Sequence, residues 1–286
     1  MSQPRSLQRF QLPLVGALLQ CLDEHQVPIP GASASGFVRL EAGRHYLYTC
    51  WHVVTGFDPN DVKVGRTLPS RRYLRVALQA ADSRQPGIEV VGGLQSLVLQ
   101  LYDSPRPPFC PRWQQDDQHV EHPDLNAIGI FVPFWHDAVK IELPSDIQLS
   151  SLQVIDETRL NASPVGPGDK CFVVGYPYGF SAFGPGQPSA IALTRFIAGD
   201  QVYGRRQQKL LESIGAPGMS GGPVFVEHGD DLLLFGIYTG SIFPDHIVRS
   251  NEKSTALGIV SDLTLLLTGG LALVSTPSQP VSTRVN

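Results

Sequence analysis

The sequence predicts an all-β protein, and three observations lead to this prediction. Short runs rich in Val, Ile, Leu, Tyr and Phe recur along the chain and are separated by Gly, Pro and Asp, the pattern of strands joined by turns. Apolar residues at helical spacing are scarce. A chain of 286 residues, 42% of them hydrophobic, is long enough to bury one large all-β core or two smaller ones.

The strands are expected where the apolar runs occur. These runs are Phe37 to Leu40, Tyr46 to Tyr48, Ile88 to Val91, Leu97 to Tyr102, Ile128 to Val132, Phe172 to Val174, Leu232 to Tyr238 and Ala256 to Val260. One short helix is expected from Leu263 to Leu267, because Asp262 can cap its first amides and Gly269-Gly270 can end it. Residues 271–286 are polar and rich in proline, so a disordered tail is expected there.

Charge and cysteine content exclude several classes of function. The net charge is −4 with a pI near 6.0, and no basic stripe with interleaved aromatics occurs, so nucleic acid is not an expected partner. The cysteines show no metal-ligand spacing and are expected as free thiols, with no metal and no other cofactor implied. They are Cys21, Cys50, Cys110 and Cys171. Cys50 and Cys171 lie in apolar runs, which predicts small buried core residues.

The N-terminal segment superficially resembles a signal peptide. Arg5 and Arg9 precede an apolar run from Leu12 to Leu22. Pro13 and Gln20 interrupt that run, and the small-residue cleavage candidate at 32–34 directly adjoins the next expected strand. Together with unpaired cysteines, this predicts a cytoplasmic protein without a membrane partner.

Two segments far apart in the chain carry the residues of a nucleophilic site. Residues 215–224 have the sequence Gly-Ala-Pro-Gly-Met-Ser-Gly-Gly-Pro-Val, and residues 49–54 have the sequence Thr-Cys-Trp-His-Val-Val. A serine hydroxyl becomes a useful nucleophile when an imidazole takes its proton and backbone amides hold the developing oxyanion. Ser220 and His52 supply these groups, and Gly218 lacks a Cβ that would keep its amide from a reacting carbonyl. The combination predicts a serine peptidase with a polypeptide substrate.

Further stretches accompany these two segments in a fixed order. They are Ala34-Ser35-Gly36-Phe37-Val38, the turn Gly166-Pro167-Gly168-Asp169-Lys170 with the strand Cys171 to Val174, and Gly175-Tyr176-Pro177-Tyr178-Gly179. The whole set resembles the chymotrypsin-fold (trypsin-like) serine peptidases, particularly the bacterial HtrA-type branch, although Tyr176 stands where that family has asparagine. The resemblance implies two six-stranded antiparallel β-barrels of the chymotrypsin type with a short C-terminal helix. Too little chain remains for the PDZ domain that many HtrA-type enzymes carry.

The resemblance also implies a division of the chain and an acid partner for His52. Residues 1–145 would form the N-terminal barrel, 146–270 the C-terminal barrel with Ser220, and 271–286 the tail. In the family, an aspartate that opens a strand of the type Asp-Ile-Ala-Leu-Ile orients the histidine. Asp124 is the first candidate, because the apolar residues that follow it then align with that strand. Asn126 is the alternative, because a shift of two residues preserves strand parity.

An acid at position 124 would leave a long stretch of chain between it and the histidine. This spacing implies an insertion around residues 71–117 in the N-terminal barrel. Such an insertion is a candidate surface for a regulatory protein partner.

The groups that contact substrate are assigned by the same resemblance. The amides of Gly218 and Ser220 would form the oxyanion hole. Ile214, six residues before the serine, would form the floor of the primary pocket, and no carboxylate stands there. A small or medium apolar residue at the cleaved position is therefore expected, rather than Lys or Arg. The substrate backbone would pair as an added strand with Thr239, Gly240 and Ser241.

Two functions from different classes remain open at this point. The first is an active serine endopeptidase with the triad His52, Asp124 and Ser220. The second is a peptidase-fold binding or scaffold protein with weak or no catalysis, which an asparagine at the acid position would favour.

Overall fold

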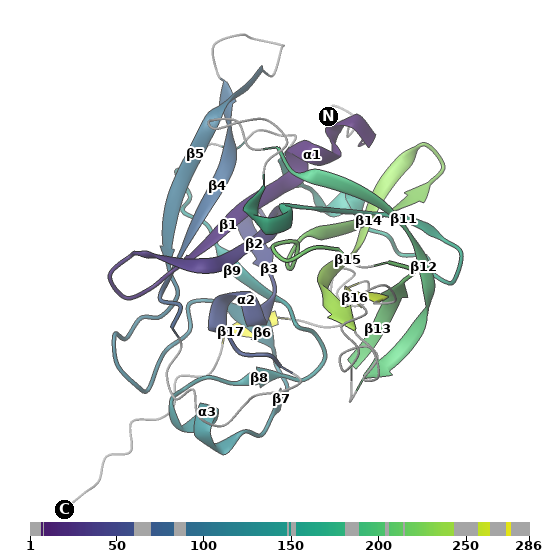
Figure 1. Cartoon of the computed structure of the whole chain (residues 1–286). Coiled ribbons are helices and arrows are strands. Elements are labelled where there is room, and N and C mark those ends of the chain that lie inside the picture. Colours follow the sequence, from purple (N-terminus) through teal and green to yellow (C-terminus); the bar gives the residue numbers. More distant parts are fainter. Residues whose placement is uncertain are drawn as a thin grey trace, which may run out of the picture.

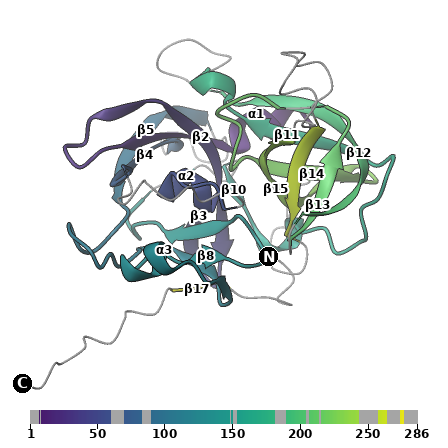
Figure 2. The same cartoon turned by 60° about the horizontal axis from the view of Figure 1, so that its bottom comes forward.

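The computed structural model describes residues 7, 9–59, 70–82, 90–147, 149, 153–180, 189–203, 206–213, 215–242, 257–263 and 273–275. These residues form two β-rich halves that lie side by side, the first mainly purple to teal and the second mainly green in Figure 1 and Figure 2. The first half is built on a nine-stranded sheet, and the second is a closed barrel of six strands. The predicted all-β fold is confirmed.

The sheet of the first half takes nearly all its strands from the N-terminal part of the chain. Along its main path the order is β17-β6-β9-β3-β2-β1-β4-β5, and β10 pairs with β2. The strands are β1 (Gly16–Leu22), β2 (Pro28–Glu41), β3 (Arg44–Thr49), β4 (Tyr73–Asp82), β5 (Val90–Gln100), β6 (Gln114–Asp116), β9 (Val139–Glu142), β10 (Val154–Ile155) and β17 (Leu273–Ser275). A separate two-stranded sheet joins β7 (His119–Val120) to β8 (Val132–Pro133).

The barrel of the second half closes in the order β11-β12-β13-β16-β15-β14. Its strands are β11 (Lys170–Gly175), β12 (Ile191–Tyr203), β13 (Arg206–Leu211), β14 (Pro223–His228), β15 (Asp231–Ile242) and β16 (Leu257–Asp262). The helical segments of the described residues are short: η1 (Arg9–Gln11), α1 (Leu12–Val15), α2 (Trp51–Thr55), α3 (Pro123–Ala127), η2 (Glu157–Arg159) and η3 (Pro177–Gly179). None of these helices combines the length and the hydrophobicity that crossing a lipid bilayer requires.

Turn chemistry fixes the hairpin that leads toward the histidine. Glu41 pairs with Arg44, so β2 and β3 are joined by the two residues Ala42 and Gly43. Both have positive φ, at 46° and 79°. Such a two-residue turn matches the right-handed twist of the strands and sets their register. The register then carries Thr49, the last residue of β3, to the edge of the site.

Apolar residues on both faces of β11 connect the two halves. Phe172 and Val174 belong to the large core that the second half shares with the first half. Cys171 and Val173 belong to the core inside the closed barrel. Successive side chains of a strand point to opposite faces, so a continuous apolar run fits a strand that is buried on both sides.

Several expected boundaries differ from the structure. Within the region expected as an insertion around 71–117, β4 and β5 belong to the sheet, since β4 pairs with β1 along five residues and with β5 on its other side. The first half also extends past residue 145, because β10 pairs in parallel with β2. Within the expected tail 271–286, Leu273–Ser275 forms β17 and pairs with β6. The expected helix from Leu263 to Leu267 lies outside the described residues beyond its first residue.

Candidate active site

His52 lies on α2, directly after strand β3. Thr49 of β3 pairs with Val139, the first residue of β9, in an antiparallel register. The chain beyond Thr49 and the chain before Val139 therefore meet at the same end of the sheet. This register brings Asp137, two residues before β9, next to His52.

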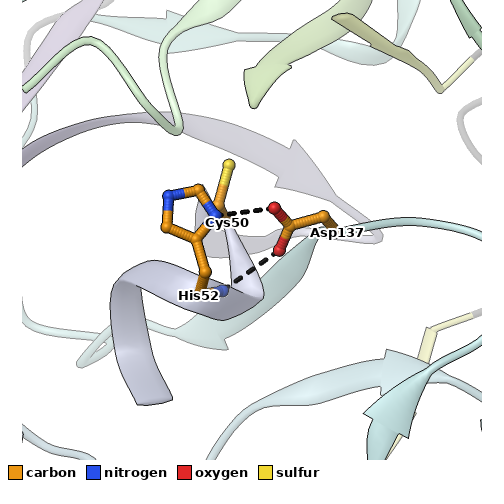
Figure 3. Close-up of side chains that lie close together, drawn as sticks. All are labelled: Cys50, His52 and Asp137. Atoms are coloured by element: carbon orange, nitrogen blue, oxygen red, sulfur yellow. Dashed lines mark hydrogen bonds and ion pairs between the residues drawn. The ribbon is translucent and has the colours of Figure 1, made fainter. Parts of the chain in front are cut away.

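The Asp137 carboxylate holds His52 at two atoms. One oxygen lies 2.6 Å from Nδ1 of the imidazole, and the other accepts a hydrogen bond of 3.0 Å from the backbone N–H of His52. Figure 3 shows the carboxylate reaching both the ring and the backbone of α2. Asp137 is 6% exposed, so water competes little for either bond. A carboxylate bonded to Nδ1 leaves Nε2 free to take a proton and stabilises the imidazolium.

The structure corrects the expected position of the acid. Asp124 lies exposed in the first turn of α3, and the strand expected to begin there is a helix from Pro123 to Ala127. Pro123 occupies the N-terminal turn of that helix, where its fixed φ and missing N–H are tolerated. The amide of Asn126 donates to Glu121 at 2.8 Å, so the alternative candidate is also directed elsewhere.

The C-terminal end of α2 is fixed by a glycine and an arginine. Gly56 has φ of 81° and donates its N–H to the carbonyl of His52 at 2.9 Å. Arg71 donates from one guanidinium nitrogen to the carbonyls of His52 and Val53, at 2.8 and 2.6 Å. A cation at the last carbonyls of a helix satisfies acceptors that have no partner inside the helix. Together with Asp137, these contacts fix both ends of the short helix that carries the imidazole.

Ser220 follows a tight turn in the second half. Met219 donates its N–H to the carbonyl of Ala216 at 3.1 Å, and Gly218 at the third turn position has φ of 95°. Pro217 at the second position completes the pattern of a type II turn. A Cβ on Gly218 would lie 2.5 Å from the carbonyl oxygen of Tyr176, so only glycine fits. The sequence therefore dictates both the turn and its close contact with η3.

The turn leaves two amides without a protein acceptor. The carbonyl of Pro217 accepts a hydrogen bond of 2.5 Å from the N–H of Tyr178, which directs that carbonyl away from the turn. Within the described part of the chain, the N–H groups of Gly218 and Ser220 donate to no other group, while that of Met219 between them is paired. Two such amides next to a serine can hold an oxyanion.

Ser35 of the first half holds this turn in place. Its N–H donates to the carbonyl of Ser220 at 2.9 Å, and its Oγ donates to the carbonyl of Gly218 at 2.7 Å. The same Oγ accepts from the N–H of Tyr176 at 2.9 Å. Its carbonyl accepts from Thr49 Oγ1 at 2.9 Å, and Ser35 is fully buried. Every polar group of Ser35 thus joins the serine turn to the strand that leads to His52.

His52 and Ser220 share their nearest neighbours. The carbonyl of Tyr238 accepts from the N–H of Gly221 at 2.8 Å and from the thiol of Cys50 at 3.4 Å. Cys50, two residues before His52, and Gly221, directly after Ser220, thus meet at one atom. Ser220 Oγ donates to the carbonyl of Thr239 at 3.4 Å, and no hydrogen bond joins it to His52 in the described residues. Bonds of this kind are often loose without substrate and shorten on binding.

A comparison with protein families identifies the family of the chain. Residues 34–237, more than half of the chain, match the family of the trypsin-like peptidase domain. The chain belongs to this family. The fold and family are therefore those of serine peptidases, which are hydrolases. No curated protein matches the chain.

Among solved structures, the trypsin-like peptidase domain is similar to two proteases of low sequence identity. One is the HtrA-type protease AlgW with a decapeptide, with 17% identity, a TM-score of 0.45, and coverage of 89% of this chain and 62% of that chain. The other is the thermostable serine protease AL20 from an extremophilic microorganism, with 12% identity, a TM-score of 0.46, and coverage of 88% and 92%. This chain thus spans less than two thirds of the AlgW chain.

A cavity of about 350 Å³ opens beside the imidazole of His52. His52 and Asp137 form one part of its wall, and the strand segment Thr239, Gly240 and Ser241 forms another. Its other lining residues are Gly56, Phe57, Asp58, Pro59, Arg71, Gln208 and Ile259. The three predicted backbone-pairing residues therefore face the same space as the base. Ile214, the predicted pocket floor, lies outside the described residues.

Cys50 is the nearest thiol to the catalytic pair. Ligand atoms of Cys50, His52 and Asp137 all lie within 4.8 Å of one another. Figure 3 shows the three side chains gathered together. Burial, and then the charge of Asp137, raises the pKa of the Cys50 thiol well above its ordinary value. A protonated thiol is a poor metal ligand, and the imidazole Nδ1 is already bonded to Asp137. This cluster is explained by a His–Asp pair packed against a buried thiol, and all four cysteines are free.

Proposed function

We propose that the protein is a serine endopeptidase that cleaves polypeptides through an acyl-enzyme intermediate. Ser220 Oγ attacks the scissile carbonyl while Nε2 of His52 takes its proton. His52 then gives that proton to the leaving amine. In the second stage His52 takes a proton from water, the water oxygen attacks the acyl carbon, and the proton returns to Ser220 Oγ as the acid product leaves. Asp137, in place of the expected Asp124, holds the imidazole and stabilises its charged form.

The observation that carries this proposal is that Asp137 bonds to His52 at two atoms, while the turn that leads to Ser220 has two backbone amides without an acceptor in the described residues. The carboxylate bonds at 2.6 and 3.0 Å to the ring and backbone of the histidine. The amides of Gly218 and Ser220 have no acceptor in the described residues, whereas the Met219 amide between them donates to Ala216. The two free donors support the predicted oxyanion hole. Charge that develops on the carbonyl oxygen can be held there by groups already in position.

Substrate is proposed to bind as an extended strand along Thr239, Gly240 and Ser241. This segment lines the cavity beside His52. A Cβ on Gly240 would meet no atom within 4 Å, so its surroundings leave space for a second backbone. The proposal keeps a small or medium apolar residue at the cleaved position, a cytoplasmic location and the option of a regulatory protein partner.

The alternative of an inactive scaffold loses its main argument. That argument depended on an asparagine at the acid position. The residue bonded to Nδ1 is the carboxylate of Asp137. Within the expected insertion at 71–117, β4 and β5 are strands of the main sheet. No observation in the site favours the scaffold.

A fluorophosphonate probe tests the proposal directly, because it labels only a serine that is activated as a nucleophile. We expect labelling of the wild-type protein, and loss of labelling in Ser220→Ala and His52→Ala. Ser96→Ala, on the exposed side of β5, is the matched control and should label as wild type does. Absence of labelling in folded wild-type protein would refute the peptidase and favour the scaffold.

A further inference from the structure

Tyr238 lies next to the loop that carries Ser220. Its backbone belongs to β15 and pairs with the serine loop: its N–H donates to Gly222 at 2.9 Å, and its carbonyl accepts from Gly221 at 2.8 Å. Its side chain is 2% exposed and contributes to the core of the barrel. Tyr238 therefore connects the loop of the proposed nucleophile to the core of the barrel.

The phenol spans the distance between the two walls that flank Ser220. One wall is the turn that begins at Gly215, whose N–H donates to Tyr238 Oη at 2.8 Å. The other is the end of β15, where Ser241 Oγ lies 3.0 Å from the same oxygen. A single hydroxyl that contacts both walls fixes the ring across the space between them. Burial raises the pKa of this hydroxyl, so it stays protonated and keeps both bonds at neutral pH.

No volume is left between the ring and the turn. A Cβ added to Gly215 would lie 2.8 Å from both Cζ and Oη of Tyr238, closer than atoms of this kind approach. Gly215 therefore contacts the ring with its backbone alone. A substrate side chain that extends into this contact would have to displace either the ring or the turn.

The space matters because of where the proposed acyl group lies. Ser220 Oγ is bonded to the carbonyl of Thr239, and substrate backbone is proposed to run along Thr239 to Ser241. The side chain of the residue whose carbonyl is attacked then points into the space between β15 and the Gly215 turn. That is the space occupied by Tyr238.

We propose that Tyr238 fills the primary specificity pocket and restricts the residue at the cleaved position to glycine or alanine. This inference rests on the proposed peptidase function and narrows its substrate class from small or medium apolar residues to the smallest ones. Tyr238 acts through its volume and makes no contact with the proton that is transferred. It is a specificity-determining residue rather than a catalytic one.

The test uses peptidyl boronic acids, which bind an activated serine as mimics of the tetrahedral state. Two inhibitors differ only in the side chain next to boron, alanine-like or leucine-like. Each is titrated against fluorophosphonate labelling of Ser220. In wild type, the leucine-like inhibitor should be weaker by about 100-fold, since a side chain of the wrong size in a closed pocket costs about 10- to 200-fold for each methylene-sized misfit.

Three variants separate ring volume from other effects. Tyr238→Val should lower the preference for the alanine-like inhibitor at least about tenfold, because it opens the pocket. Tyr238→Phe keeps the ring and should keep the wild-type preference. Tyr102→Val truncates another tyrosine that is 2% exposed, in the core of the first half, and should keep the preference as well.

Each result decides between the two claims. Equal inhibition of wild type by both compounds would overturn the role of Tyr238 while leaving the peptidase in place. The same conclusion follows if Tyr238→Val labels normally with an unchanged preference, or if Tyr238→Phe relaxes the preference as much as Tyr238→Val. Absence of labelling in wild type would refute the peptidase itself. If Tyr238→Val does not fold, the wild-type titration alone still decides whether the pocket is closed.

Discussion

The two halves of the molecule hold the proposed catalytic groups in different ways. His52 follows β3 and Asp137 precedes β9, the neighbouring strand of the same sheet, and the two side chains are hydrogen-bonded within the first half. Ser220 belongs to the closed barrel, yet its turn is held by hydrogen bonds from Ser35 in the other half. The acid–base pair is therefore set by the register of one sheet, whereas the position of the nucleophile depends on contact between the halves.

The largest effect is expected from Asp137→Asn, which tests whether the pairing of His52 with Asp137 positions the imidazole. We expect kcat to fall by about four orders of magnitude, because an amide at this position fixes the wrong imidazole tautomer. The measurement is kcat on a peptide substrate, or the rate of fluorophosphonate labelling. Asp124→Asn, on exposed α3, is the matched control and should leave the rate unchanged. Equal losses in the two variants would contradict the assignment of Asp137.

The dependence of the nucleophile on the contact between halves is tested by Ser35→Ala. The change leaves the carbonyl of Gly218 and the N–H of Tyr176 buried without the hydroxyl that joins them. We expect the free energy of unfolding to fall by about 1–3 kcal/mol. We also expect kcat/KM to fall by about 10- to 100-fold, since a small displacement of a reacting group has effects of this size.

Denaturant unfolding and peptide kinetics measure the two effects of Ser35→Ala. Ser96→Ala removes an exposed hydroxyl from β5 and should change neither quantity. If Ser35→Ala lost stability but kept full activity, the turn would be held by other contacts. The position of Ser220 would then not depend on the contact between the halves.

A smaller effect is expected from Arg71→Gln, which weakens the support of α2 from its C-terminal end. The guanidinium donates to the carbonyls of His52 and Val53. Losing a charged donor at a helix end should lower the free energy of unfolding by about 1 kcal/mol and kcat by about tenfold. Arg75→Gln removes the same charge from a residue that donates to Gln20 instead, and it should be neutral. An unchanged kcat in Arg71→Gln would show that Asp137 alone positions the imidazole.

The same contrast explains which parts of the site could be predicted from sequence. The all-β class, the histidine after an apolar strand and the turn around Ser220 depend on local patterns, and the structure has them where expected. The acid depends on strand register, which local patterns determine poorly. The apolar residues after Asp124 fit a strand, yet Pro123 before it favours a helix N-terminus.

A better signal for the acid was present in the chain. Asp137-Ala138-Val139-Lys140-Ile141 is an aspartate that opens an alternating strand, and β9 begins two residues after the aspartate. The supposed insertion at 71–117 followed from the misplaced acid, since it was counted from Asp124. The role of Tyr238 could not be predicted, because its volume matters only where a turn from one part of the chain meets a strand from another.

The smallest expected effect concerns thiols and reports on the contact between the halves. Burial raises the pKa of Cys171 to about 12, and it raises the pKa of Cys50 and Cys21 as well. At pH 8 the thiolate fraction of Cys171 is then about 10⁻⁴, so alkylation by iodoacetamide should be slow. Cys110 is half-buried and should react first. Mass spectrometry of timed samples measures all four sites in one experiment.

Cys50 distinguishes the contact between halves from global unfolding. Its thiol donates across the boundary to the carbonyl of Tyr238, whereas Cys171 lies in the core of the barrel. Ser35→Ala should therefore speed alkylation of Cys50 several-fold while Cys171 stays at the wild-type rate, because local opening exposes only groups at the opened contact. If alkylation of Cys50 and Cys171 accelerated equally, the protein would open as one unit. The contact between the halves would then not open separately, and the contrast between the two halves would be lost.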